Sequence, residues 1–348
     1  MKAALMTGFD GPLPVEEVPE PPCPRDGAIV AVRACGVCRS DHHAWKGADP
    51  DVTLPHVIGH EFAGTVVETG PDCHAFRAGD RVTAPFILGC GTCPDCRGGE
   101  PTICAHQHVI GFTCQGAFAE RLAIARADFN LVRLPEAVSL VAAAGMGCRV
   151  TTAFRAVADR GALQPGEWLA VHGCGGVGLS AVMIGAAMGA QVLAVDIASE
   201  PLEMARQMGA SATLDARAGN VGDTIREVTG GGVHVSVEAL GHTATFENSL
   251  RGLRKMGRHV QVGMPVGAHA SPTLPLLDLV YARQITLMGT RGIGANRFAA
   301  LFEMIRAGRL DPAQLVTGTI PLSQAGATLR AMDRFQGHGV TVIDRMDR

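Results

Sequence analysis

The sequence has little charge and few aromatic side chains. Charged residues make up 18% of its 348 residues and aromatic residues 4%, with one Tyr and two Trp, and the formal net charge is -3. No run of Lys and Arg is present, so binding to nucleic acid or to an anionic membrane is disfavoured. A run of about 18 apolar residues, which a membrane span needs, is also missing, and the first residues lack the apolar core of a signal peptide. We therefore expect a cytoplasmic protein.

Cysteine, by contrast, is plentiful. Eleven cysteines without a secretion signal favour a reducing compartment and thiolate–metal chemistry. Four of them follow the spacing C-x2-C-x2-C-x7-C in a Gly- and Pro-rich stretch: Cys90, Cys93, Cys96 and Cys104. Short C-x2-C steps let one loop wrap a tetrahedral Zn²⁺, and four sulfurs leave no open position. The spacing predicts a structural zinc site, with a disulfide cluster as the alternative.

Length and residue patterns predict two domains of the α/β class. The first half is β-rich, with β-branched runs at 28–35, 62–70 and 80–86. After about Cys148, short apolar runs at 167–173, 191–197, 234–240, 258–264 and 284–290 alternate with helix-like stretches at 179–189, 199–209, 221–230 and 243–257. Such alternation predicts a doubly wound parallel sheet. The last part has one more helix-like stretch, 298–310, and a strand-like 340–344.

A glycine-rich turn follows the first apolar run of this second half. It reads Gly173-Cys174-Gly175-Gly176-Val177-Gly178 and has a strand before it and a helix after it. In that context the glycines let the backbone approach a pyrophosphate at the helix N-terminus, whereas a bare turn without ligand is the alternative. Asp196 ends the next strand and can accept hydrogen bonds from a ribose diol. No Arg or Lys occurs at 197–200, which favours NAD over NADP.

Three further residues are candidates for a second metal site: Cys38, His60 and Cys148. Each also has a simple structural interpretation, and Cys148 alone reads as a small buried apolar residue. Spacing by itself does not bring the three together. Two thiolates and one imidazole would leave an open fourth position on zinc, as in alcohol dehydrogenases.

The motifs taken together resemble the zinc-dependent alcohol dehydrogenases of the medium-chain dehydrogenase/reductase family. Gly59-His60-Glu61-x2-Gly64-x5-Gly70-x2-Cys73 matches that family's zinc signature, and the resemblance covers essentially the whole chain. It implies a β-rich GroES-like catalytic domain at 1–150 with a structural-zinc lobe at about 88–106. A Rossmann NAD-binding domain at 151–285 and a return to the catalytic domain at 286–348 would follow.

The resemblance also implies roles for residues around the catalytic zinc. Cys38, His60 and Cys148 would bind the metal, and Glu61 is the carboxylate that approaches it during ligand exchange. Asp41 would orient His60. A proton relay would run through Ser40 and His43, with His42 as a bystander.

Coenzyme and substrate contacts follow in the same way. Arg39 would meet the pyrophosphate, Thr152 the nicotinamide, and either Arg291 or Arg297 a phosphate. The expected substrate-pocket residues, each with core packing as the alternative, are Phe86, Trp45 and Met264. Arg149 and Cys174 depart from the family pattern and receive no role, although an ion pair is one option for Arg149.

The expected function is an alcohol dehydrogenase or carbonyl reductase with two zinc ions per chain. It would transfer a hydride between a small-molecule alcohol and NAD, as a homotetramer. A polyol, sugar or specialised-metabolite dehydrogenase on the same scaffold is the alternative, although an intact four-Cys lobe and Cys148 are unlike many polyol enzymes. A zinc-free quinone reductase, a recruited protein without activity and a zinc-ribbon nucleic-acid module are less consistent with the ligand residues, the relay and the charge.

Overall fold

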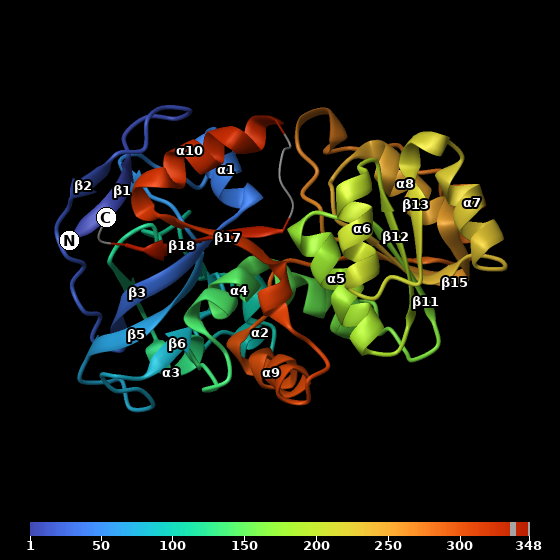
Figure 1. The fold of residues 1–348 in the computed structure, drawn as a ribbon. Coiled ribbons are helices and arrows are strands. Elements are labelled where there is room, and N and C mark those ends of the chain that lie inside the picture. The colour runs from blue at the N-terminus through green and yellow to red at the C-terminus, as the bar shows by residue number, and fades with distance from the viewer. Residues whose placement is uncertain (335–338, 347–348) are drawn as a thin grey trace. The chain divides into compact units, whose positions relative to one another are not determined.

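A computed structural model describes residues 1–334 and 339–346 of the chain. The chain forms two compact units (Figure 1). Unit 1 comprises Met1–Thr151, Gly292–Arg306 and Asp311–Arg348, and unit 2 comprises Thr152–Arg291 and Ala307–Leu310. Each unit has its own sheet and its own buried apolar cluster.

Unit 1 is built on an extended sheet of mostly antiparallel strands. Its strand order is β10-β6-β5-β3-β18-β17, and β9 also pairs with β3. The strands are β3 (Ala28–Val37), β5 (Glu61–Thr69), β6 (Arg81–Thr83), β9 (Arg121–Ile124), β10 (Val132–Arg133), β17 (Val316–Pro321) and β18 (Val340–Arg345). The β-branched runs predicted at 28–35 and 62–70 form β3 and β5, which are largely buried and pair antiparallel. β-Branched side chains pack well on such a half-buried pleated surface.

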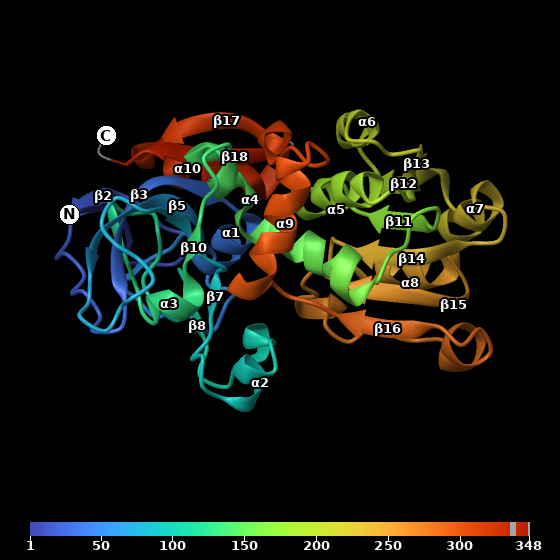
Figure 2. The same ribbon diagram turned by 90° about the horizontal axis from the view of Figure 1, so that it is seen from below.

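Smaller elements complete unit 1. They are β1 (Lys2–Met6), β2 (Val15–Glu17), β4 (His56–Val57), β7 (Ile87–Leu88), β8 (His108–Val109), α1 (Arg39–Trp45), α2 (Pro94–Arg97), α3 (Ala127–Asn130), α9 (Phe298–Arg306) and α10 (Ala325–Ala331). Helix α4 (Leu140–Phe154) carries the chain from unit 1 into unit 2. The pair β7–β8 leads into the lobe that contains α2, which extends away from the main sheet of unit 1 (Figure 2).

Unit 2 is a parallel sheet of six strands in the order β13-β12-β11-β14-β15-β16 (Figure 2). The strands are β11 (Trp168–His172), β12 (Gln191–Asp196), β13 (Ala212–Asp215), β14 (Val233–Glu238), β15 (Leu253–Gln261) and β16 (Thr286–Gly289). Figure 1 shows α5 (Gly176–Ala187) and α6 (Ser199–Gln207) on one side of the strands, with α7 (Val221–Val228) and α8 (Thr243–Gly252) on the other. Helices on both faces explain the continuous apolar strands, and the doubly wound arrangement predicted from the alternation is confirmed.

Two details of unit 2 differ from the prediction. Strand β13 was not among the predicted strands, and its residues are only half-buried. The helix expected at 243–257 ends at Gly252, and Leu253 begins β15. Leu253 is fully buried in the apolar cluster of unit 2, so its burial as a strand residue outweighs the helical pattern.

Short helical turns connect these elements. They are η1 (Pro101–Ile103), η2 (Arg155–Arg160), η3 (Ala216–Ala218), η4 (Gly267–His269), η5 (Leu276–Tyr281), η6 (Ala295–Arg297), η7 (Pro312–Leu315), η8 (Leu322–Gln324) and η9 (Met332–Arg334). Among the described residues, no helix is both long enough and apolar enough to cross a membrane.

Candidate functional site

The four cysteines of the C-x2-C-x2-C-x7-C motif converge in the lobe of unit 1. All four sulfurs lie within 4.8 Å of one another, with Cys90 and Cys96 4.0 Å apart and Cys93 and Cys104 3.7 Å apart. A tetrahedral zinc with Zn–S bonds of about 2.3 Å separates its sulfurs by about 3.8 Å. A disulfide would bring two sulfurs to about 2.05 Å. The geometry therefore fits zinc, and the eleven cysteines are free thiols in the part of the chain that the structure describes.

Backbone groups of the lobe point at these sulfurs. The Cys93 N–H donates to the Cys90 sulfur at 3.3 Å, and the Cys96 N–H donates to the Cys93 sulfur at 3.5 Å as α2 begins. Hydrogen bonds from the Thr92 hydroxyl and from backbone N–H groups lower the pKa of Cys90 to about 5. These bonds stabilise the thiolate of Cys90, the form that binds metal, whereas burial raises the pKa of Cys96 to about 12.

The second candidate centre joins three distant segments of unit 1. Cys38 follows β3, His60 precedes β5, and Cys148 lies in α4 directly after Gly147. Gly147 has a non-helical conformation (φ 5°, ψ -119°) and kinks α4. One ligand atom from each of Cys38, His60, Cys148 and the adjacent Glu61 lies within 4.8 Å of the others. The fold thus brings together three residues whose proximity could not be predicted from their spacing in the sequence.

The orientation of His60 fits a metal ligand. Its Nδ1 is 2.6 Å from an oxygen of Asp41, whose other oxygen accepts the Cys38 N–H at 2.8 Å. Because the Asp41 carboxylate accepts a hydrogen bond from Nδ1–H, the imidazole proton stays on Nδ1 and Nε2 keeps its lone pair. Nε2 is buried and has no hydrogen-bond partner within residues 1–334 and 339–346. An unpartnered nitrogen beside two sulfurs is the donor set of a three-ligand zinc site.

The two sulfurs of this centre also interact with each other. A hydrogen bond from the Cys148 thiol holds the pKa of Cys38 well below its usual range, although burial opposes the shift. The same bond, together with burial, raises the pKa of Cys148. The pair thus shares one proton, which a cation bound by both sulfurs would replace.

Arg149 forms the ion pair that the sequence offered only as an option. Its Nη1 lies 2.7 Å from a carboxylate oxygen of Glu61, and both side chains are buried. Its Nη2 donates to the carbonyl oxygen of Val37. The partners are 88 and 112 residues away in the sequence. Only the position of an Arg within an Ala- and Gly-rich stretch could have drawn attention to it.

The residues expected to move a proton lie close to Cys38. The hydroxyl oxygen of Ser40 is 3.9 Å from the Cys38 sulfur. His43 is half-buried in α1, and burial and the neighbouring His42 and Arg39 lower its pKa. The expected bystander His42 is bound to Asp333, with Nε2 2.8 Å from the carboxylate.

The expected pocket residues lie in different places. The ring of Phe86 is 5.6 Å from the His60 ring. Phe112, which the sequence did not identify, is 5.4 Å from it. Trp45 is fully buried and its indole N–H donates to the Gly11 carbonyl oxygen at 2.9 Å, an arrangement typical of core packing. Met264 belongs to unit 2 and is 47% exposed.

The glycine turn in unit 2 joins β11 to α5. Gly173 has φ +89°, a conformation that favours glycine, and a Cβ on Gly178 would overlap the Gly173 carbonyl. Asp196 ends β12, and one of its carboxylate oxygens accepts the Cys174 N–H at 2.7 Å. The other accepts the Ala198 N–H at 3.0 Å. The carboxylate thus lies beside the turn, and Cys174 packs as a buried small residue.

Three other expected coenzyme contacts have different surroundings. Arg39 begins α1 of unit 1, and its guanidinium donates to the Met332 carbonyl oxygen at 2.8 Å. Thr152 is buried in α4, one turn after Cys148. Arg291 is exposed after β16, and Arg297 is half-buried in η6.

A buried polar chain in unit 2 was not predicted. Ser249 of α8 bonds both Ser236 and the Nδ1 of His259 at 2.7 Å. Burial lowers the pKa of His259 to about 4 and that of His172, at the end of β11, to about 3. Both histidines are therefore neutral in the folded protein near pH 7.

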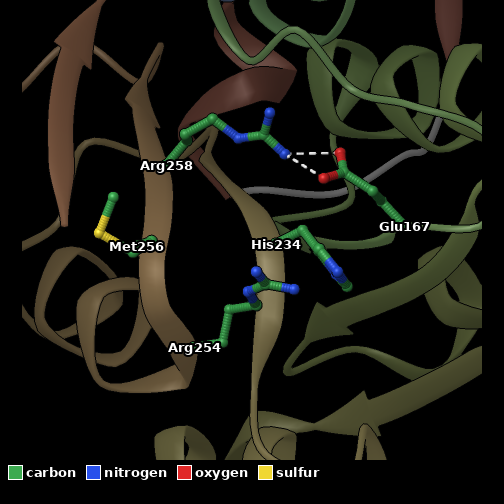
Figure 3. Close-up of a pocket in the computed structure, with 5 residues that line it drawn as sticks. All are labelled: Glu167, His234, Arg254, Met256 and Arg258. Atoms are coloured by element: carbon green, nitrogen blue, oxygen red, sulfur yellow. Dashed lines mark hydrogen bonds and ion pairs between the residues drawn. The ribbon is translucent and has the colours of Figure 1, made fainter. Parts of the chain in front are cut away.

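A small hollow lies elsewhere in unit 2, at the amino ends of the strands (Figure 3). The Nη2 of Arg258 forms an ion pair with Glu167, donating to its two carboxylate oxygens at 2.6 and 2.5 Å. The other lining residues are His234, Arg254 and Met256. The hollow contains none of the candidate catalytic residues.

Comparison with known proteins was consistent with these sites. The family model for the alcohol dehydrogenase GroES-like domain matches residues 24–136, and the model for zinc-binding dehydrogenase matches residues 176–307. Both matches agree with the predicted GroES-like and Rossmann folds.

Similar proteins cover almost the whole chain. An alcohol dehydrogenase of Geobacillus stearothermophilus is 34% identical over 348 residues, covering 99% of this chain and 98% of the relative. An NAD-dependent alcohol dehydrogenase of Sulfurisphaera tokodaii is 30% identical, with 99% of each chain covered. The solved structure of alcohol dehydrogenase TADH from Thermus sp. ATN1 has a TM-score of 0.91 at 32% identity and covers 99% of this chain and 100% of that chain. The chain therefore belongs to the zinc-type alcohol dehydrogenases of the medium-chain dehydrogenase/reductase family, enzymes that transfer a hydride between an alcohol and NAD.

Proposed function

We propose that Cys38, His60 and Cys148 hold the zinc at which the alcohol is oxidised, so that the activity depends on zinc. The observation that carries this assignment is the buried Nε2 of His60, which has no partner among the described residues and lies beside the two sulfurs. When bound, zinc acts as a Lewis acid that lowers the pKa of the alcohol, and NAD accepts the hydride. Asp41 fixes the His60 tautomer, and the four sulfurs of the lobe hold a second, structural zinc.

The proton of the alcohol leaves through α1. The Ser40 hydroxyl lies 3.9 Å from the Cys38 sulfur, where it would accept the proton of an alcohol held at this site. His43 follows one turn later, and its depressed pKa keeps it neutral and able to accept a proton near pH 7.

Replacing His43 with glutamine is expected to slow alcohol oxidation at pH 7 by about tenfold, less than the roughly 10² of a direct general base because water can partly replace the relay. The rate should recover in part at high pH, where hydroxide takes the proton. The measurement is the pH profile of kcat/KM. His74→Gln, an exposed histidine of the same unit, serves as control, and a His43→Gln profile identical to it would remove His43 from the relay.

The coenzyme residues divide between phosphate and ribose contacts. The turn from Gly173 through Gly175, Gly176 and Val177 to Gly178 places the N-terminus of α5 against the pyrophosphate, with Arg39 and Arg291 as its cationic contacts. Asp196 holds the adenosine ribose, and Thr152 packs on the nicotinamide. Gly175, the N-cap of α5, has no side chain to cap the first N–H groups of the helix, which supports the pyrophosphate position.

The substrate is an apolar alcohol rather than a polyol. Phe86 and Phe112 place two aromatic rings against His60, and such walls offer no hydrogen bonds to additional hydroxyls. The test is NAD reduction with matched primary, secondary and aromatic alcohols and with sugar alcohols, and a preference for sugar alcohols would contradict the proposal.

The enzyme acts in the cytoplasm as a homotetramer. Free thiols throughout the described residues are consistent with a reducing compartment. Edge strand β16, which pairs only with β15 among the described residues, offers unpaired backbone groups. Exposed apolar residues accompany it: Leu276, Leu277, Tyr281 and Leu287. Together they form a surface suited to a second copy of the chain.

Light scattering is expected to give four times the chain mass of 36.2 kDa. Leu287→Lys should shift the distribution to smaller species, because a lysine on an edge strand opposes strand pairing. Lys255→Leu, an exposed change elsewhere in unit 2, serves as a control for altered charge. A wild-type mass equal to that of one chain would contradict the assembly.

A further inference from the structure

The three candidate zinc ligands come from segments with no sequence proximity. Asp41 links the segments of Cys38 and His60. The hydrogen bond between the Cys38 and Cys148 sulfurs is lost once both become thiolates. Cys38 follows β3, His60 precedes β5 and Cys148 lies in α4. Contacts that keep all three at coordinating distance before a metal binds raise the affinity, because a ligand set that is ordered only on binding gives up affinity to the entropy of ordering.

One side chain contacts all three segments. Arg149 directly follows Cys148 in the chain. Its Nη2 donates to the carbonyl oxygen of Val37, the residue before Cys38, and its Nη1 binds the carboxylate of Glu61, the residue after His60, at 2.7 Å. The guanidinium is a rigid planar fork, so the two bonds fix the separation of their partners. Arg149 is 5% exposed, Glu61 is 0% and Val37 is 1%, so water competes little for these bonds.

Glu61 adds a second link between the segments that carry His60 and Cys148. The carboxylate oxygen that Arg149 leaves free accepts the Cys148 N–H at 2.9 Å. The kink at Gly147 presents that N–H group sideways, where a straight helix would use it internally. A Cβ at Gly36 would overlap the carboxylate of Glu61, and a Cβ at Gly147 would overlap its Cβ. Two glycines therefore make room for this buried carboxylate.

We propose that Arg149 is the positioning residue of the three-ligand zinc site: its guanidinium ties together the segments that carry Cys38, His60 and Cys148, and so assembles the site for zinc. The proposal rests on the proposed assignment of these three residues as ligands. It gives Arg149 no contact with substrate. Its cationic charge also offsets the carboxylate and the thiolates, which would otherwise repel one another in a buried site.

The test is competition for zinc between the protein and a chelator, with zinc counted per chain. Arg149→Met is expected to release one of its two zinc ions at a chelator concentration about 10- to 100-fold lower than wild type, the usual effect of removing an outer partner of a metal site. The zinc in the four-Cys lobe should remain bound at wild-type strength. Cobalt substituted into the released position should show weakened thiolate-to-metal absorption in this variant.

Chain position provides a matched control. Arg97 directly follows the lobe cysteine Cys96 as Arg149 follows Cys148, but Arg97 is exposed. Arg97→Met should therefore leave both zinc affinities unchanged. Arg149→Lys keeps the charge but not the fork, and should lose an intermediate amount of affinity while preserving the fold.

The double variant Arg149→Met/Glu61→Gln distinguishes a role of Arg149 in zinc binding from a role in stability alone. Removing both charges relieves the cost of an unpaired buried carboxylate and should restore much of the thermal stability, yet zinc affinity should stay low because the tie is absent. Wild-type zinc affinity in Arg149→Met, or in Arg149→Lys should the methionine variant not fold, would overturn the proposal. A wild-type protein with only one zinc would instead overturn the ligand assignment, and the proposal with it.

Discussion

Replacing Cys38 with alanine is expected to reduce kcat/KM for alcohol oxidation by about 10³-fold or more, since a Lewis acid supplies several kcal/mol to the transition state and each 1.36 kcal/mol is a factor of ten. The variant should still fold and bind NAD, because the glycine turn and Asp196 belong to unit 2. Elemental analysis should find one zinc per chain in place of two.

Substitutions of two other cysteines serve as comparisons for the loss of zinc and activity in Cys38→Ala. Cys35 is buried in β3 and lies outside both sulfur clusters, so Cys35→Ala should keep two zinc ions and most of the activity. Cys93→Ser should also leave one zinc, but the effect should appear as a lower melting temperature, because a closed four-sulfur site contributes folding energy. Full activity in Cys38→Ala would contradict the catalytic assignment, and two zinc ions in Cys93→Ser would contradict the structural one.

The wild-type enzyme is expected to prefer NAD over NADP by about a hundredfold in kcat/KM, which corresponds to roughly 2.7 kcal/mol. The carboxylate of Asp196 lies beside the glycine turn at the end of β12, where it would face a 2′-phosphate. Residues 197–200 provide no Arg or Lys to offset the repulsion. Asp196→Ser should reduce the preference for NAD, because it weakens the binding of NAD and removes the repulsion between the carboxylate and the 2′-phosphate of NADP.

Steady-state kinetics with both coenzymes measures this preference. Asp223→Ser, which removes an exposed acid on α7 of the same unit, should leave the ratio at its wild-type value and so separates a local effect from one of net charge. Equal efficiency of the wild-type enzyme with NAD and NADP would show that Asp196 does not face the ribose.

Much of unit 2 was predictable because its signals are local. Continuous apolar strands alternate with helices. A glycine with positive φ lies just after the end of each of three helices, at positions 189, 209 and 230. Strand β13 and the early end of α8 were not predictable, because they depend on pairing with β12 and β14 rather than on their own residues. Packing overrides local preference at such places.

The candidate site shows the same division. The four-Cys lobe lies within one short loop, so spacing alone indicated the metal. The ligands of the second centre could be brought together only through the resemblance, because their proximity is a product of the whole sheet. The sequence pattern assigned no role to three residues of the structure: Arg149, Phe112 and His172. The contacts of each depend on the tertiary fold, and such contacts produce no periodic pattern in the sequence.

The position of β18 has a consequence for how the protein is made. β18 pairs with β3 through residues 35–37, so the main sheet of unit 1 joins strands about 300 residues apart. Nearly all of unit 2 is one contiguous stretch that emerges from the ribosome before β17 and β18. Unit 2 can therefore fold during synthesis, while the apolar edge of β3 beside Cys38 stays open until β18 has been synthesised. In that interval the unpaired backbone groups of β3 are open to pairing with another chain, so aggregation of the nascent chain competes with the completion of this sheet.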